Sequence, residues 1–211
     1  MRHGILPVGQ TDKIKLSSVD RDFLIGFAGG LYAYSAWNCL LEALTLNDWK
    51  LNGRNVIVRV MGGRFFFESR EKANIQYLGW RSISEAVKLL ADCDVNYLPY
   101  PFESSSYYMV KYGFPTKLST YAATGRPVFV HAPEYSSIYN FFMKHPIGIC
   151  CKSLEPSDVI VGLEKLESNE EYYVKMANKM VEMANSELSV ENFHKQFAEF
   201  VGIKRNTLLT K

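Results

Sequence analysis

The sequence has few cysteines, and none of them shows the spacing of a metal site. Its four cysteines form neither a C-x-x-C pair nor a Cys/His ligand pattern. Cys150 and Cys151 are adjacent in an apolar run, where buried free thiols are the expected state. These features favour a reducing compartment and argue against a zinc site.

Long hydrophobic runs and an excess of one charge are also absent. No segment approaches the roughly 18 apolar residues that span a bilayer, and the N-terminus lacks the apolar core of a signal peptide. With 24 basic and 22 acidic residues the net charge is +2, which gives no electrostatic case for nucleic acid as a partner. We expect a cytoplasmic protein, and a location at the inner face of the cell membrane stays open.

What the sequence does contain is an alternation of short apolar runs and helical segments. The expected strands cover 23–27, 55–61, 74–78, 94–98, 127–130 and 147–150. The expected helices cover 35–46, 82–91, 116–124, 136–144, 156–166, 170–186 and 190–201. This alternation predicts an α/β fold, a Rossmann-like three-layer αβα arrangement with a parallel sheet of about six strands and a helical C-terminal extension.

The same patterns suggest boundaries along the chain. We expect a linker or entering segment at 1–21, a Rossmann-like domain at 22–152, C-terminal helices packing on that domain at 153–203, and a frayed tail at 204–211. The long segment between the fourth and fifth strands, 99–113, reads as a loop.

The stretch GFPTKLSTYAATGRPVFV, residues 113–130, carries the strongest functional signal. Thr116 can cap a helix of about two to three turns, which Gly125 ends before a buried strand. On this helix Lys117 and Thr120 share a face, so a cation and a hydroxyl lie beside a helix N-terminus, which suits a diphosphate and a ribose. A solvated amphipathic helix without a ligand is the alternative.

Several glycines follow the expected strands. Because the carboxyl ends of parallel strands meet at one edge of a sheet, the glycine pairs at 29–30 and 62–63, the glycine at 79 and the Lys117 helix should converge there. This convergence favours a ligand site over the alternative.

The pieces, in this order, resemble the C-terminal, nucleotide-sugar-binding half of GT-B-type glycosyltransferases, especially the group 1 family of retaining enzymes. The matching segments are FAGG (27–30), LLEAL (40–44), VRVMGG (58–63), IQYLGW (75–80), NYLPY (96–100) and FPTKLSTYAATGRPVFV (114–130). The resemblance covers about residues 22–150, and only the last segment is specific by itself.

The resemblance implies a set of site residues. Those implied as catalytic are Lys117 and Glu103; those implied as substrate-binding are Gly29, Gly30, Arg64, Gly79, Trp80, Phe114, Thr116 and Thr120.

Each implied role has a structural alternative. Gly29 and Gly30 would let backbone N–H groups approach the donor phosphates, or form a simple tight turn. Lys117 would stabilise the leaving diphosphate, or be a solvated lysine. Trp80, with Gly79, would wall the nucleobase pocket, or belong to the core. Glu103 would contact the sugar, or be a solvated loop acid. Arg64 is a weaker candidate for a phosphate contact.

The sequence also departs from the family. Many relatives carry a Glu at the position of Thr120, where its carboxylate holds the ribose hydroxyls; a hydroxyl makes a weaker hydrogen bond. The segment LYAYSAW (31–37) lacks the cation that relatives often carry after the glycine turn. No Asp-x-Asp motif is present, so we expect no metal and no cofactor beyond the nucleoside diphosphate sugar.

The function that the resemblance implies is donor binding in a glycosyltransferase that transfers a hexosyl group to a glycan or lipid-linked acceptor, as in polysaccharide biosynthesis. A GT-B enzyme has two such domains, so the acceptor half should come from an N-terminal domain or a separate subunit, and this chain alone should be inactive. The aromatic residues Trp80, Tyr100, Phe102, Tyr107 and Tyr108 should line the interdomain cleft and be partly exposed. The alternatives are a nucleotide-sugar epimerase of the same architecture and a non-catalytic, flavodoxin-like binding module.

Overall fold

The computed structural model describes residues 16, 18, 20–63 and 72–202. The strands are β1 (Phe23–Ala28), β2 (Lys50–Leu51), β3 (Arg54–Met61), β4 (Ile75–Gly79), β5 (Val95–Pro99), β6 (Val128–His131) and β7 (Gly148–Cys151). The helices are α1 (Tyr34–Leu46), α2 (Ile83–Ala91), α3 (Tyr107–Tyr112), α4 (Lys117–Ala122), α5 (Ser137–Lys144), α6 (Pro156–Ser168), α7 (Glu170–Ala184) and α8 (Val190–Phe200), with short 3-10 turns η1 (Lys72–Asn74) and η2 (Ser104–Ser106).

Six of the strands form one parallel sheet. Their spatial order is β4-β3-β1-β5-β6-β7, and the short β2 pairs antiparallel with the start of β3. The first strand, β1, therefore lies in the middle of the sheet. The next strands, β3 and β4, lie on one side of it, and β5 pairs with its other side. In sheets of this order, ligands bind at the carboxyl edge beside the first strand, where the direction of winding reverses.

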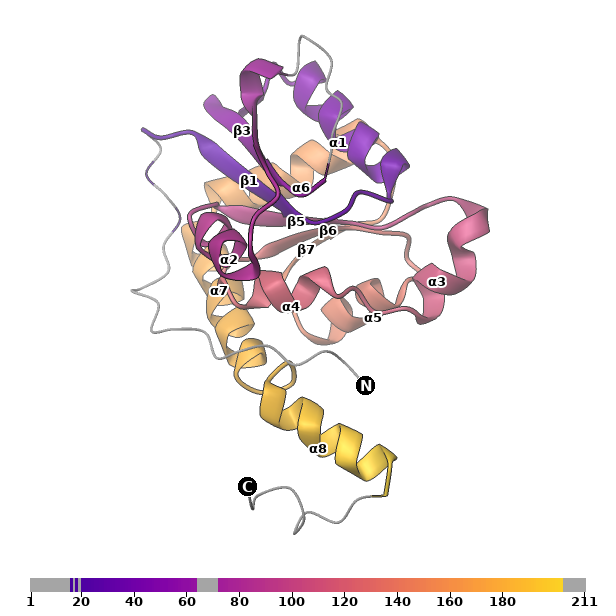
Figure 1. Ribbon diagram of the computed structural model, residues 1–211. Coiled ribbons are helices and arrows are strands. Elements are labelled where there is room, and N and C mark those ends of the chain that lie inside the picture. Colours follow the sequence, from indigo (N-terminus) through magenta and orange to yellow (C-terminus); the bar gives the residue numbers. More distant parts are fainter. Residues whose placement is uncertain (1–15, 17, 19, 64–71, 203–211) are drawn as a thin grey trace.

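Helices cover both faces of the sheet and enclose two cores (Figure 1). On one face α1 and α6 bury Phe27, Leu40 and Leu163 with the strands. On the other face α2, α4 and α5 bury Leu90, Leu118 and their neighbours. This is the predicted Rossmann-like three-layer arrangement.

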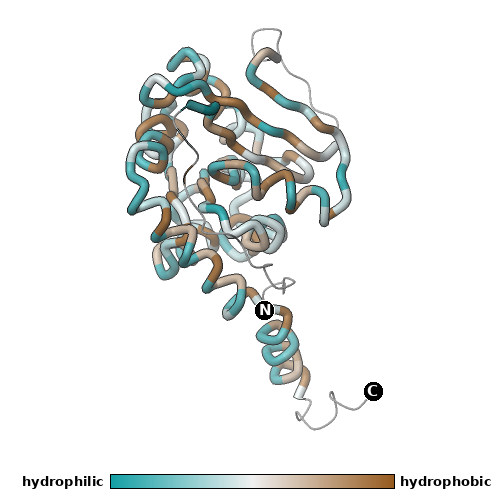
Figure 2. Tube along the Cα trace, turned by 90° about the vertical axis from the view of Figure 1, so that its left-hand side faces the viewer, coloured by the Kyte–Doolittle hydropathy of each residue, from teal (hydrophilic) through white to brown (hydrophobic). Residues whose placement is uncertain are grey.

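The helix α7 connects the two cores. Its first half adds Tyr173 and Met176 to one core, and its second half adds Met180 and Met183 to the other. The Tyr173 hydroxyl donates to the Asp94 carbonyl at 2.6 Å, which ties α7 to the sheet. The helix α8 then leads away from this body, alternating hydrophobic and hydrophilic residues along its length (Figure 2).

The predicted elements are found within two residues of their expected bounds, whereas β2, α3 and the short turns η1 and η2 were not predicted. The capping box at the start of α2 is present, with the Ser82 hydroxyl and the Glu85 carboxylate each accepting from the other's backbone N–H. The β2–β3 hairpin was not predicted, although its turn residues Asn52 and Gly53 both have positive φ, as an Asn-Gly turn favours. The expected loop at 99–113 contains η2 and α3.

All four cysteines are free, as expected. Burial raises the pKa of Cys39 to about 11 and that of Cys93 to about 12. Both thiols are therefore protonated at neutral pH and act as packing groups.

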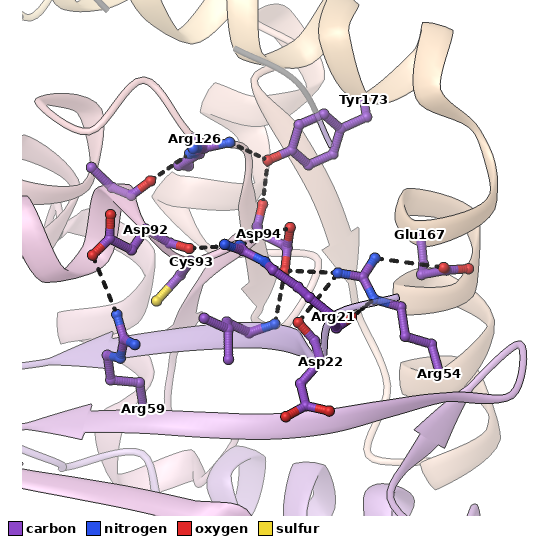
Figure 3. A network of polar contacts seen from close by, with 12 residues as sticks. Arg21, Asp22, Arg54, Arg59, Asp92, Cys93, Asp94, Arg126, Glu167 and Tyr173 are labelled. Atoms are coloured by element: carbon purple, nitrogen blue, oxygen red, sulfur yellow. Dashed lines mark hydrogen bonds and ion pairs between the residues drawn. The ribbon is translucent and has the colours of Figure 1, made fainter. Parts of the chain in front are cut away.

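A buried ionic network lies at the amino edge of the sheet, opposite the edge where a ligand is expected (Figure 3). The Arg54 guanidinium lies 3.4 Å from the Asp94 carboxylate and 3.7 Å from that of Glu167, and all three side chains are buried. Asp94 also accepts from the Leu24 backbone N–H at 2.8 Å. These contacts join the starts of β1, β3 and β5 with α6, so the network holds the fold together.

Candidate functional site

The glycine turn after β1 forms one wall of the candidate site. Gly29 has a φ of +103°, and its N–H donates to the Met61 carbonyl at the end of β3 at 2.9 Å. A Cβ on Gly62 would lie 2.4 Å from the Gly29 carbonyl oxygen, so the two turns approach as closely as glycine allows. This contact fixes the ends of β1 and β3 side by side.

Lys117 lies directly against this turn. Its Nζ donates to the Gly30 carbonyl at 2.8 Å and lies 4.5 Å from the centroid of the Tyr32 ring. Its Cε is 3.0 Å from the position of a Cβ on Gly29. The helix α4 and the first glycine turn, far apart in sequence, therefore meet at one point of the carboxyl edge.

The environment of Lys117 weakens its hold on a proton. Burial between the turn and the Tyr32 ring lowers the pKa of Lys117 to about 8, because the ammonium loses hydration there. Its hydrogen-bonded neighbour among the described residues, the Gly30 carbonyl, is neutral. An anion beside Nζ would replace the lost hydration and stabilise the charged form.

A cavity of about 350 Å³ opens at this point, within the range of roughly 300–1,000 Å³ typical of small-molecule sites. Its walls come from the ends of β1, β3 and β4 and the starts of α2 and α4. They comprise Ala28, Gly29, Met61, Gly62, Trp80, Arg81, Ile83, Ala86, Thr116, Lys117, Ser119 and Thr120. The lining combines apolar side chains with two cations and three hydroxyls.

The cavity brings together five residues from the set named on the sequence, namely Gly29, Trp80, Thr116, Lys117 and Thr120. Trp80 is 76% exposed, so it does not belong to the core, which was the alternative to a place in the pocket wall. Gly30 and Gly79 adjoin the cavity: the Gly30 carbonyl accepts from Lys117, and the Gly79 carbonyl accepts from the Gly62 N–H at 3.0 Å.

Two other residues of the set lie elsewhere. Phe114 packs edge-on against Phe141 of α5, with 5.2 Å between ring centroids, and borders the second core. Glu103 is exposed beside the start of α1, not in the cavity. Burial would raise the pKa of Glu103, but hydrogen bonding to its own backbone N–H and to Ser35 prevails and lowers it. Arg64 lies outside the described residues.

The expected form of α4 needs a correction. The helix has six residues, shorter than the two to three turns expected, and Thr116 makes no side-chain cap. Thr116 itself has helical dihedral angles, φ −64° and ψ −28°, a conformation unlike the extended backbone of a capping residue. Lys117 is therefore positioned by its contact with the glycine turn.

The reading of the aromatic residues as a partly exposed wall is also corrected in part. Tyr100 is 3% exposed and belongs to the second core, so it cannot line a cleft. Tyr108 is 76% exposed, and Phe102 and Tyr107 are half-buried. Tyr100 directly follows the buried strand β5 and is buried in the same way as that strand.

Arg81 and Ser119 line the cavity but were not named on the sequence, whereas Gly62, which also lines it, was expected at this edge only as part of a glycine pair. Arg81 follows Trp80 at the end of β4, and its guanidinium donates to the Trp80 carbonyl at 2.8 Å. Ser119 lies between two residues that were named. The sequence could have indicated these residues only because they are adjacent to named ones. Such adjacency does not distinguish a residue that lines the cavity from a solvated residue.

Within the described part of the chain, no cluster of His, Cys, Asp or Glu side chains could hold a metal ion. No helix in that same part combines the length and apolar character needed to cross a membrane.

Solved structures provide the comparison, since no protein-family model and no curated protein sequence matches the chain. HepE of Anabaena, in complex with UDP-glucose, matches with a TM-score of 0.64 and 14% identity over 87% of this chain and 50% of HepE. WaaG, a glycosyltransferase involved in lipopolysaccharide biosynthesis, matches with a TM-score of 0.61 and 12% identity over 95% of this chain and 55% of WaaG.

S. aureus TarM, in complex with fondaparinux, α-GlcNAc-glycerol and UDP, matches with a TM-score of 0.66 and 12% identity over 92% of this chain and 38% of TarM. The chain thus spans about half the length of HepE and WaaG, and less of TarM. At such identities the likeness is one of fold. The chain has the fold of one domain of the GT-B-type glycosyltransferases, as the resemblance in sequence predicted.

Proposed function

We propose that this chain is the donor-binding domain of a glycosyltransferase and binds a nucleoside diphosphate sugar in the cavity beside Lys117. The observation that carries the proposal is the meeting of Lys117 with the glycine turn, 2.8 Å from Nζ to the Gly30 carbonyl, at the mouth of that cavity. Cavities at this edge of a doubly wound sheet are the usual place for nucleotides. The fold shared with HepE, which was solved with UDP-glucose, adds support.

In this proposal the parts of the ligand follow the walls of the cavity. The diphosphate lies against Lys117 and the glycine turn, where the ammonium has donors left beyond its bond to Gly30. The ribose lies near Thr120 and Ser119, and the base packs against the exposed face of Trp80. The sugar then points past the turn, towards the side where Glu103 lies.

The transfer breaks the bond between the anomeric carbon and a phosphate oxygen of the donor, a new bond forms between that carbon and an acceptor hydroxyl oxygen, and the proton of that hydroxyl is released. The departing diphosphate gains negative charge, which Lys117 stabilises. Two cations, three hydroxyls and no carboxylate on the described walls are a poor set for Mg²⁺, which prefers carboxylate oxygens, so we infer a metal-independent step. The acceptor, a glycan or a lipid-linked sugar, is held by a part of the enzyme beyond this chain.

Titration calorimetry with UDP, GDP and ADP tests the binding step. We expect one of the three to bind, and Lys117→Ala to weaken that binding at least about tenfold, because the diphosphate loses its cation. Lys111→Ala is the matched control: Lys111 is an exposed lysine of α3 outside the cavity, so its removal should leave the affinity unchanged.

Other outcomes separate the alternatives. If none of the three nucleotides binds, a non-catalytic binding module is favoured. Binding accompanied by conversion of a nucleotide sugar to its epimer favours an epimerase. Transfer of a labelled sugar to an added acceptor by the 211-residue chain alone would overturn the part of the proposal that assigns the acceptor site elsewhere. We place the reaction in the cytoplasm, in polysaccharide assembly at the inner face of the membrane.

A further inference from the structure

The described walls of the cavity carry cationic and hydroxyl groups but no carboxylate. Lys117 and Arg81 supply two cations, and Thr116, Ser119 and Thr120 supply three hydroxyls. None of the described residues that line the cavity is an Asp or a Glu. These described walls can therefore bind phosphate oxygens well, but they offer no charged acceptor for a sugar hydroxyl.

Among the residues that the structure describes, the acid that adjoins the cavity lining in sequence is already engaged. Glu85 lies on α2 between Ile83 and Ala86, which both line the cavity. Its carboxylate accepts from the Ser82 backbone N–H at 3.0 Å and from the Ser82 hydroxyl, completing the capping box of α2. Withdrawing it to bind a ligand would uncap the helix.

The hydroxyls nearest the expected ribose position are weak substitutes for a carboxylate. The Ser119 hydroxyl donates its proton to the Thr116 carbonyl at 2.7 Å, so towards a ligand it acts only as a neutral acceptor. Thr120 lies one residue further along α4, half-buried in the wall. Hydrogen bonds between neutral groups are roughly half as strong as those with a charged partner.

We infer that this site does not discriminate between ribose and 2′-deoxyribose, so its donors include 2′-deoxyribonucleoside diphosphate sugars, with Thr120 as the residue that sets this tolerance. The inference rests on the proposed function. A site built to bind a hydroxyl rejects an analogue without it by as much as about 10⁴-fold, because a buried polar group is left unpaired. Among the described walls, loss of the 2′-hydroxyl leaves no charged group unpaired, so we expect the ribose and deoxyribose forms to bind with similar affinity.

The test compares each nucleotide with its deoxy form by titration calorimetry: UDP with dUDP, GDP with dGDP, and ADP with dADP. For the pair that binds, we expect dissociation constants within about threefold of each other. Thr120→Glu should create the missing acceptor and raise the preference for ribose to tenfold or more. Thr120→Val, which keeps the volume and removes the hydroxyl, should leave the ratio near one.

Ser84→Glu is the control for added charge. It places a carboxylate on the exposed side of α2, outside the cavity, and should leave the ratio unchanged. A wild-type preference for ribose of tenfold or more would overturn the inference and leave the proposed function standing. Equal weakening of both forms by Thr120→Glu would also overturn it, since the ribose would then lie elsewhere. Failure of every nucleotide to bind would instead overturn the proposed function.

Discussion

Lys117 combines a position beside the ligand cavity with a loosely held proton. Burial lowers the pKa of Lys117 to about 8, and the neutral Gly30 carbonyl is its bonded partner. The charged form, which a diphosphate requires, is therefore lost as the pH rises through about 8. The free protein loses little charge at this position below pH 7.

From this we predict a pH dependence of nucleotide binding. Affinity should be nearly constant up to about pH 7 and fall about tenfold by pH 9, because Lys117 must then take up a proton to bind. Titration calorimetry between pH 6.5 and 9 measures the change. Lys117→Arg should abolish it, because a guanidinium stays charged over this range. A fall of the same size in Lys117→Arg would assign the titrating group to another residue.

The same shift has the opposite sign for folding. Unfolded chains hold this proton up to a pKa near 10.5, so between about pH 8 and 10.5 the unfolded state binds more protons than the folded state. Stability conferred by this residue therefore rises with pH over that window. Ligand binding and folding thus favour different protonation states of one side chain.

Sequence reasoning found Lys117, Trp80, Thr116 and Thr120 because they belong to segments that match the family, and it missed Arg81, which lies one residue beyond such a segment. Phe114 belongs to the same motif as Lys117, yet it packs on Phe141. A motif records which residues are close in the chain, and the direction of each side chain depends on what the rest of the fold places beside it.

Among the secondary-structure elements, the starts of β1, β3 and β5 depend on the ionic network at the amino edge (Figure 3). Arg54 and Asp94 are both buried, so each needs the other to offset its lost hydration. The sequence gives no sign of this, because 40 residues separate the two partners.

Breaking this pair should be costly. We predict that Asp94→Asn lowers the free energy of unfolding by about 3 kcal/mol, since it leaves the Arg54 charge poorly compensated in the interior. Urea denaturation measures this quantity. Glu134→Gln serves as the control: it breaks the exposed pair with Lys152 and should cost at most about 0.5 kcal/mol. Equal effects of the two substitutions would contradict the structural role of the network.

Across the whole molecule, α7 determines how the two cores cooperate. It contributes side chains to both, and Tyr173 holds it to the sheet. The helices on either face of the sheet cannot unfold without disturbing the contacts of α7. The two cores should therefore unfold together.

We predict a single unfolding transition. Trp37 and Trp49 are buried in one core, whereas Trp80 is exposed, so fluorescence of a Trp80→Phe variant reports on that core alone. Its urea midpoint should coincide with that of the far-UV circular dichroism signal, which reports on all helices. Loss of the circular dichroism signal at a clearly lower urea concentration would show that α7 and its neighbours unfold separately.

The sequence alone determined the alternation of strands and helices and thus the parallel sheet, because each element's apolar pattern and its end signals are local. It also determined that glycine turns and Lys117 would share the carboxyl edge, because parallel strands end there together. The tertiary structure decided which side chains face the cavity, that Tyr100 is buried in a core and Phe114 packs against it, and that Arg54 pairs with Asp94. These depend on contacts between residues far apart in the chain, which no local pattern records.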